Sequence, residues 1–191
     1  KPVKGLTFAI LKTVAMENVV DLPKKAFQNS IEKLKEAGAS ISEISVSSVD
    51  EAMDLTGLLY SPEAYATWKH KIEKSPDLMF AKILERFRSG ANVLASDFIH
   101  AWEKLIDLRQ QYHSEVEAYD AVLIPASPII PPEIGRLMDD GDFYNSQNLL
   151  ALRNTRIGNL MGGCSITLPT HIPSCGLLIM GRPNEDERLL R

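Results

Sequence analysis

The stretch "CSITLPTHIPSCGLLIMG", residues 164–181, decides how the distal part of the chain folds. Two short apolar runs, 164–169 and 175–181, flank a polar turn, and this pattern predicts a β-hairpin. In such a hairpin Cys175 lies beside the turn and Cys164 lies at the open end. A disulfide needs Cα atoms within roughly 7 Å of each other. We therefore expect two free thiols and a reducing compartment, with a cytoplasmic location.

The residues that lead into this hairpin predict a strand, a stiff loop and a helix. Within "YDAVLIPASPIIPPEIG", residues 119–135, an apolar run over 121–125 predicts a buried strand, and four prolines between 125 and 132 prevent the ladder from continuing. The acidic "RLMDDGDFY" that follows predicts a flexible turn. A helix over roughly Ser146 to Met161 then leads to a glycine pair and the hairpin.

The opening of the chain predicts two parallel strands joined by a helix. Residues 6–11, "LTFAIL", and 39–46, "ASISEISV", have strand character. Between them, Asp21 is a candidate helix cap, and Gly38 is suited to end the helix in a left-handed conformation. A strand, a helix and a second strand in this order predict a crossover connection with parallel strands.

The middle of the chain is predicted to be helical. Pro62 should bend or break the first long helix near Ser61, and a shorter helix should end at Gly90. A third helix, opening at Ser96 or Asp97, carries an apolar stripe at helical spacing that is typical of a buried core face; its members are Phe98, Trp102, Leu105, Leu108 and Tyr112.

These elements predict a single α/β domain or fragment over 1–191, with a mixed sheet flanked by helices. We divide it into a strand–helix–strand unit at 1–47, a helical segment at 48–118, and a sheet, hairpin and closing helix at 119–191, the last helix capped by Asn184. The formal net charge of −4 argues against nucleic acid or an anionic membrane as the main partner. No apolar run is long enough to span a bilayer.

The sequence contains no self-contained set of catalytic residues. Cys164 and His171 should lie roughly 15–20 Å apart, because they occupy opposite ends of a strand with about 3.4 Å per residue. No G-x-S-x-G elbow and no phosphate-binding glycine loop is present. The four histidines show no paired ligand spacing, so we expect no metal and no cofactor.

Three motifs in the same order resemble the distal half of the amidase signature family. They are "YDAVLIPASPIIPPEIG", "RNTRIGNLMGGCSITLP" and "CGLLIMGRPNEDERLLR". The opening "VKGLTFAI" and "KAFQNSIEKLKEAGASI" resemble the segment after the family's signature block, and "SPEAY" resembles its recurring Glu-Ala helix. The resemblance therefore covers nearly the whole chain and implies the distal half of an amidase-signature-like fold.

The resemblance also implies where the chemistry of such an enzyme resides. Family members use a Ser–cis-Ser–Lys triad on a glycine/serine-rich block that would precede Lys1. The triad hydrolyses a carboxamide through an acyl-enzyme. The resemblance thus implies that the present chain contributes the sheet scaffold and one wall of a pocket for a small amide. It implies no catalytic residue within this chain. A homodimer is the expected assembly if the chain associates with itself.

Five residues are substrate-binding candidates on the resemblance. Arg86, in "RFRSG", falls where related amidotransferase A subunits place an arginine for the substrate carboxylate. Thr155 and Asn159 match polar residues before the family's N-x-x-G turn, and Tyr60 and Tyr144 are weaker candidates. Two other readings remain open: part of a glutamyl-tRNA amidotransferase A subunit, or a non-catalytic α/β binding or assembly module.

Overall fold

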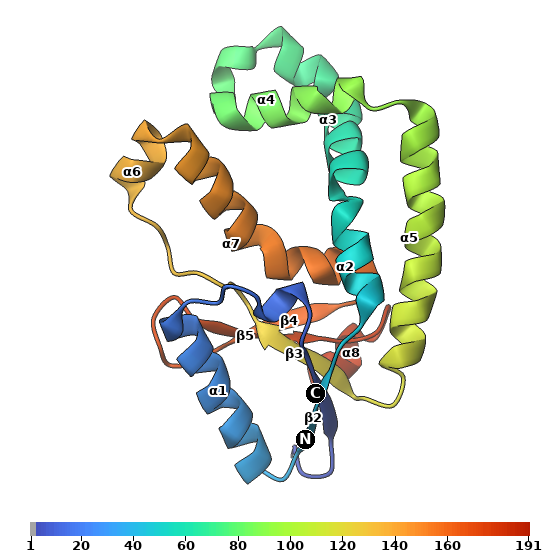
Figure 1. Cartoon of the computed structure of the whole chain (residues 1–191), viewed down its shortest axis with the longest axis vertical. Coiled ribbons are helices and arrows are strands. Elements are labelled where there is room, and N and C mark those ends of the chain that lie inside the picture. Colours follow the sequence, from blue (N-terminus) through green and yellow to red (C-terminus); the bar gives the residue numbers. More distant parts are fainter. Residues whose placement is uncertain (1–2) are drawn as a thin grey trace.

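The computed structural model describes residues 3–191 and contains a five-stranded mixed sheet in the order β2-β1-β3-β5-β4. The strands β2, β1 and β3 run parallel, and β5 runs antiparallel to both β3 and β4. The bounds are Thr7–Leu11 for β1, Ser40–Ile44 for β2, Ala121–Pro125 for β3, Ser165–Pro169 for β4 and Gly176–Met180 for β5. The predicted mixed sheet flanked by helices is confirmed (Figure 1).

The distal hairpin has the predicted register. Pro169 pairs with Gly176 beside the turn, and Ser165 pairs with Met180 at the open end. Both cysteines are free. The Cys164 thiol donates to the carbonyl of Arg182 at 3.2 Å, so each thiol lies at its own end of the hairpin.

Helix α1, Asp21–Glu36, connects the two parallel strands β1 and β2 and buries Phe27 and Ile31 against the sheet. Gly38 follows it with a φ of +91°, as predicted for a left-handed helix end. The prediction that Asp21 caps this helix is wrong, because the helix begins at Asp21 and no side chain caps it. The carboxylate instead lies in the first turn, where the helix dipole favours negative charge.

The sheet is covered on both faces, and successive residues of each strand point to opposite sides. Along β1, Phe8 and Ile10 pack toward α1, whereas Ala9 and Leu11 belong to a larger core beneath the other helices. In Figure 1, α1 lies on one face, and α2, α5 and α7 lie on the other. No helix among residues 3–191 is long and apolar enough to cross a membrane.

Four helices form the middle of the chain. They are α2, Ser47–Asp54; α3, Thr56–Lys74; α4, Ala81–Ser89; and α5, Ala95–Glu115. Two 3-10 turns, η2 at Pro76–Leu78 and η3 at Gly90–Asn92, flank α4. Three members of the predicted stripe of α5 are buried (Leu105, Leu108 and Tyr112), whereas Phe98 and Trp102 are only partly buried.

The expected break at Ser61 is absent, because α3 continues through Pro62 and the chain is interrupted earlier, at Leu55. A proline inside a helix removes one backbone hydrogen bond. Here the backbone of η3 packs against that turn: a Cβ on Gly90 would lie 2.1 Å from the carbonyl oxygen of Ser61. Tertiary packing of this kind holds the helix together where local propensity opposes it.

The acidic segment expected to be a flexible turn is helical. It forms α6, Ile134–Asp139, and the first turn of α7, Gly141–Met161, which begins five residues before the predicted Ser146. The Asp140 carboxylate accepts a hydrogen bond from the backbone N–H of Phe143 at 2.9 Å. Asp140 is thus the N-cap that starts the helix early, and Gly162, with a φ of +67°, ends it.

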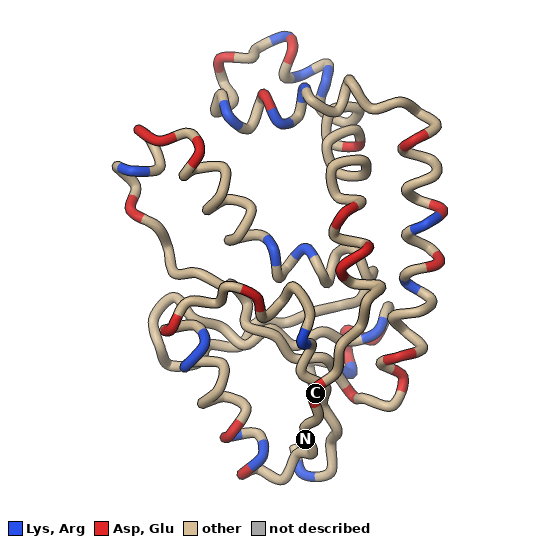
Figure 2. Tube along the Cα trace, in the orientation of Figure 1, with Lys and Arg blue, Asp and Glu red and all other residues tan. Residues whose placement is uncertain are grey.

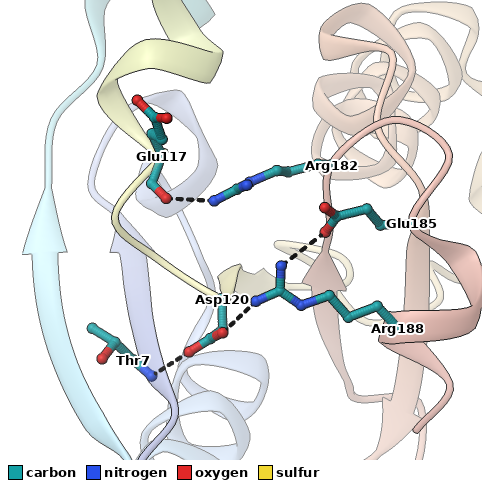
Figure 3. A network of polar contacts seen from close by, with 6 residues as sticks. All are labelled: Thr7, Glu117, Asp120, Arg182, Glu185 and Arg188. Carbon is teal, nitrogen blue, oxygen red and sulfur yellow. Dashed lines mark hydrogen bonds and ion pairs between the residues drawn. The ribbon is translucent and has the colours of Figure 1, made fainter.

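The closing helix α8, Asp186–Leu189, is not capped by Asn184, which adopts a left-handed φ of +63°. Its position is set by ion pairs instead. Figure 3 shows Arg188 reaching both Asp120 and Glu185, while the second oxygen of Asp120 accepts the N–H of Thr7 at 2.8 Å. Asp120 precedes β3, so this network joins α8 to the start of two strands.

Candidate functional site

The five substrate-binding candidates lie on three helices. Tyr144, Thr155 and Asn159 are on α7, Arg86 is on α4 and Tyr60 is on α3. Figure 2 shows basic residues along α4 and on the part of α7 nearest the sheet. The candidates therefore belong to one group of neighbouring helices.

Two cations of α4 contact neutral groups on α6 and α7. Arg86 Nη1 donates to Asn148 Oδ1 at 2.5 Å. One helical turn earlier on α4, Lys82 Nζ lies 4.5 Å from the ring centroid of Tyr144 and donates to the Leu137 carbonyl at 3.2 Å. None of these partners carries a negative charge.

Tyr60 is partly exposed and faces other charged groups. Burial raises the pKa of its phenol, whereas the positive charges of Arg156 and Arg109 lower that pKa. The negative charge of Glu63, one helical turn further along α3, raises the pKa of the Tyr60 phenol. Tyr60 and Arg156 thus lie close enough to interact, although they come from α3 and α7.

Thr155 and Asn159 are both exposed. The Thr155 hydroxyl donates to the carbonyl of Leu152 at 3.1 Å, a bond within its own helix. The carbonyl of Asn159 accepts from Arg109 Nη2 at 3.3 Å. The backbone of Asn159 is therefore held from α5 while its side chain lies at the surface.

The end of α7 is fixed by two side chains of α5. Arg109 Nε donates to the carbonyl of Leu160 at 2.5 Å, and His113 Nε2 lies 3.0 Å from the carbonyl of Met161. Carbonyls at a helix C-terminus lack intrahelical donors and carry partial negative charge, which a guanidinium satisfies. This clamp positions the turn that leads into β4.

Sequence reasoning missed a buried polar pair on α7. Asn154 is 0% exposed and donates from Nδ2 to the carbonyls of Ala15, at 3.0 Å, and Pro125, at 2.7 Å. Arg153 is 7% exposed and donates to the same Ala15 carbonyl and to Asn154 Oδ1. Burial lowers the pKa of Arg153 and the charge of Glu17 raises it.

This pair joins α7 to the carboxyl ends of β1 and β3. Ala15 lies in the 3-10 turn η1, Val14–Met16, after β1, and Pro125 ends β3. A sequence signal existed: Arg153 and Asn154 lie four and three residues before the buried Ile157, on the core face of the helix. Polar residues at core spacing indicate a buried hydrogen-bonding network.

Two of the cavities in the described chain lie away from this group of helices. An open pocket of about 680 Å³ is lined by Thr167, His171 and Cys175 among others, and burial raises the pKa of the Cys175 thiol. A cavity of about 930 Å³ lies between α8 and the start of β1. Neither contains any of the five candidates.

The described residues hold no group of three His, Cys, Asp or Glu side chains that could bind a metal ion. Cys164 and His171 lie at opposite ends of the hairpin, since Cys164 adjoins the open end and His171 lies in the turn with a φ of +64°. The helices α3, α4 and α7 carry the cations, phenols and amides of the candidate group.

Comparisons with known proteins agree with this fold. The family model Amidase matches residues 1–190. An amidase of Pseudomonas putida is 26% identical over 99% of this chain and 42% of its own length. The A subunit of a glutamyl-tRNA(Gln) amidotransferase from Staphylococcus aureus is 27% identical over 100% of this chain and 44% of its own length.

Among solved structures, an allophanate hydrolase of Kluyveromyces lactis superposes on the whole chain with a TM-score of 0.81 at 18% identity. That likeness shows a shared fold over 31% of the hydrolase chain. The chain spans about two fifths of the length of the curated relatives it matches. With the family model covering residues 1–190, this chain belongs to the Amidase family.

Proposed function

We propose that this chain is the C-terminal portion of an amide hydrolase and supplies the sheet scaffold and one wall of the substrate pocket. The observation that carries the proposal is the family match over residues 1–190 together with coverage of only 42% and 44% of the two relatives. The catalytic serine then belongs to polypeptide that completes the enzyme.

In the complete enzyme the serine oxygen attacks the amide carbon and forms an acyl-enzyme, the C–N bond breaks, and the amine leaves with a proton. Water then attacks the ester, releases the acid and restores the serine. Backbone N–H groups stabilise the oxyanion of each tetrahedral intermediate. No side chain of residues 1–191 takes part in these steps.

The wall of the pocket is formed by the helices α3, α4 and α7. Arg86 binds the polar end of the substrate, because a planar guanidinium offers parallel N–H donors. Tyr60 and Tyr144 line the pocket beside it, and Thr155 and Asn159 lie toward the turn before β4. The Arg86–Asn148 bond of 2.5 Å supports this arrangement, since it holds the guanidinium between the two helices.

A second candidate is a portion of an amidotransferase A subunit, which the relative in Staphylococcus aureus favours. In that case the released ammonia passes to a partner protein. The third hypothesis is a non-catalytic binding or assembly module.

The two unbridged cysteines support a reducing compartment such as the cytoplasm as the location of the protein.

The test compares this chain alone with the same chain joined to the upstream segment of its reading frame, using a panel of small primary amides. We expect ammonia release only from the joined protein, and we expect a fluorophosphonate probe to label a serine upstream of residue 1. Robust turnover or labelling within residues 1–191 alone would contradict the proposal. Ammonia release that requires an added partner protein would favour the amidotransferase.

A further inference from the structure

One face of the sheet is less completely covered than the other. The helices α2, α5 and α7 lie on one face, whereas α1 and, through Leu189, the short helix α8 cover the opposite face (Figure 1). On this second face Phe8 and Ala121 are buried, but Ile179 of β5 is only partly buried. A sheet with parallel strands normally buries both of its faces under other elements. The partly covered area can therefore accept a further element.

The cavity of about 930 Å³ lies over this area. Its floor is apolar and comes from Leu6, Phe8, Ala121 and Ile179, and Leu189 of α8 forms one side. None of its described lining residues belongs to α1. Since a helix with its side chains is about 10–12 Å across and rises about 1.5 Å per residue, this volume corresponds to about two helical turns.

Paired charges surround the cavity. Arg188 binds both Asp120 and Glu185, and this network fixes α8 beside the start of β1 and β3 (Figure 3). The exposed Lys4 and Asp186 add one charge of each sign to the rim. The rim therefore suits flanking residues of both signs around an apolar occupant, which is the pattern of an amphipathic helix.

We propose that this cavity is the docking surface for an amphipathic helix of the polypeptide that completes the enzyme. The inference rests on the proposed function, and it names the surface at which the two portions of the protein meet. More than half the length of each of the two relatives lies outside the part that this chain matches, so a complete enzyme has polypeptide available to fill the cavity. The apolar side of that helix packs on Leu6, Phe8 and Leu189.

The first experiment measures which side chains lose contact with solvent in the complete protein. This chain and the protein expressed from its complete reading frame are labelled with hydroxyl radicals, and the label on each residue is measured by mass spectrometry. We expect the labelling of Leu6 and Leu189 to fall, in the complete protein only, to the level of the fully buried Leu11. Labelling of Leu6 and Leu189 that is the same in both proteins would overturn the inference.

The second experiment identifies the occupant. The photoreactive residue p-benzoylphenylalanine replaces Leu189 in the complete protein, and the cross-linked peptides are sequenced. We expect cross-links from this position to one helix outside residues 1–191. Cross-links to a second copy of the chain, to a bound small molecule, or only to other residues within 1–191 would overturn the assignment.

Two adjacent positions provide a matched pair of variants. Leu189→Glu and Leu190→Glu both add a carboxylate at the end of α8, but Leu189 lines the cavity whereas Leu190 is 72% exposed and does not line it. Leu189→Glu should lower the Tm of the complete protein more than that of this chain, because only the docked helix buries the new charge. Leu190→Glu should leave both Tm values nearly unchanged. Equal shifts for the two variants in the complete protein would contradict the inference.

These measurements are independent of catalysis, so they separate the docking surface from the proposed function. A complete protein that protects Leu6 and Leu189 but releases no ammonia from any amide would remove the proposed function and leave the docking surface. Ammonia release by a complete protein in which both leucines stay labelled would remove the docking surface and leave the hydrolase.

Discussion

The buried amide of Asn154 holds two backbone carbonyls from distant parts of the chain. Its Nδ2 group donates to carbonyls at the ends of two different segments, Ala15 and Pro125. Its oxygen accepts from Arg153, which itself holds the Ala15 carbonyl. Since buried backbone carbonyls need donors, this side chain satisfies one carbonyl in η1, after β1, and one at the last residue of β3.

Asn154→Ala should destabilise the fold by about 2–4 kcal/mol, because it leaves the buried Pro125 carbonyl without its amide donor and the Ala15 carbonyl with Arg153 alone. The free energy of unfolding, from urea denaturation followed by circular dichroism, measures the effect. Asn145→Ala, at an exposed position on the same helix, is the control and should change stability by less than about 0.5 kcal/mol. A loss below about 1 kcal/mol for Asn154→Ala would show that the network is not what holds this junction.

At the scale of elements, the close approach of η3 to α3 explains why a helix survives an internal proline. The Gly90 backbone touches the turn at Ser61–Pro62, with its missing Cβ only 2.1 Å from the Ser61 oxygen and 2.6 Å from the Pro62 nitrogen. The neighbouring atoms are backbone, so they cannot move aside as a flexible side chain could. This contact also sets where α4 lies, since α4 ends at Ser89.

Gly90→Ala should therefore cost about 2 kcal/mol or more, because the methyl group would force two backbone segments apart. Gly57→Ala, in the first turn of α3 with no atom within 4 Å of the added Cβ, should be neutral or stabilise by up to about 1 kcal/mol. Thermal and urea unfolding of both variants provide the measurement. Similar stabilities for the two would disprove the packing argument.

At the scale of the whole molecule, the sheet ends in a strand with an open edge. Within residues 3–191, β4 pairs only with β5, and most of its residues are exposed, including Leu168 at 43%. An exposed edge with apolar side chains favours pairing with another strand. This edge is the surface through which we expect two copies of the chain to associate.

Sedimentation velocity at several protein concentrations should show a dimer in equilibrium with the monomer. Leu168→Lys should shift that equilibrium toward the monomer, because a charge on the strand edge opposes pairing. Lys24→Glu, on the exposed side of α1, serves as a control with a charge change away from β4. A parent chain that stays monomeric at all concentrations, or a Leu168→Lys variant that dimerises equally, would contradict the prediction.

The sequence by itself determined the strands, the parallel pair β1–β2 and the distal hairpin. Short apolar runs bounded by turns predicted β1, β3 and the hairpin, and a helix between two such runs predicted the parallel pair β1 and β2. These features could be predicted because periodicity and turn chemistry are properties of contiguous residues. The apolar stripe on α5 could be predicted for the same reason, and three of its members are buried: Leu105, Leu108 and Tyr112.

Only the tertiary structure decided the polar network and the group of cations. Asn154 and Ala15 are 139 positions apart, and Arg86 and Asn148 are 62 apart. Neighbouring residues carry no signature of such contacts, and the same reason explains why α3 continues through Pro62. The cations and phenols on α3, α4 and α7 are likewise brought together by packing and not by local sequence, because Tyr60, Arg86 and Arg156 lie on three different helices.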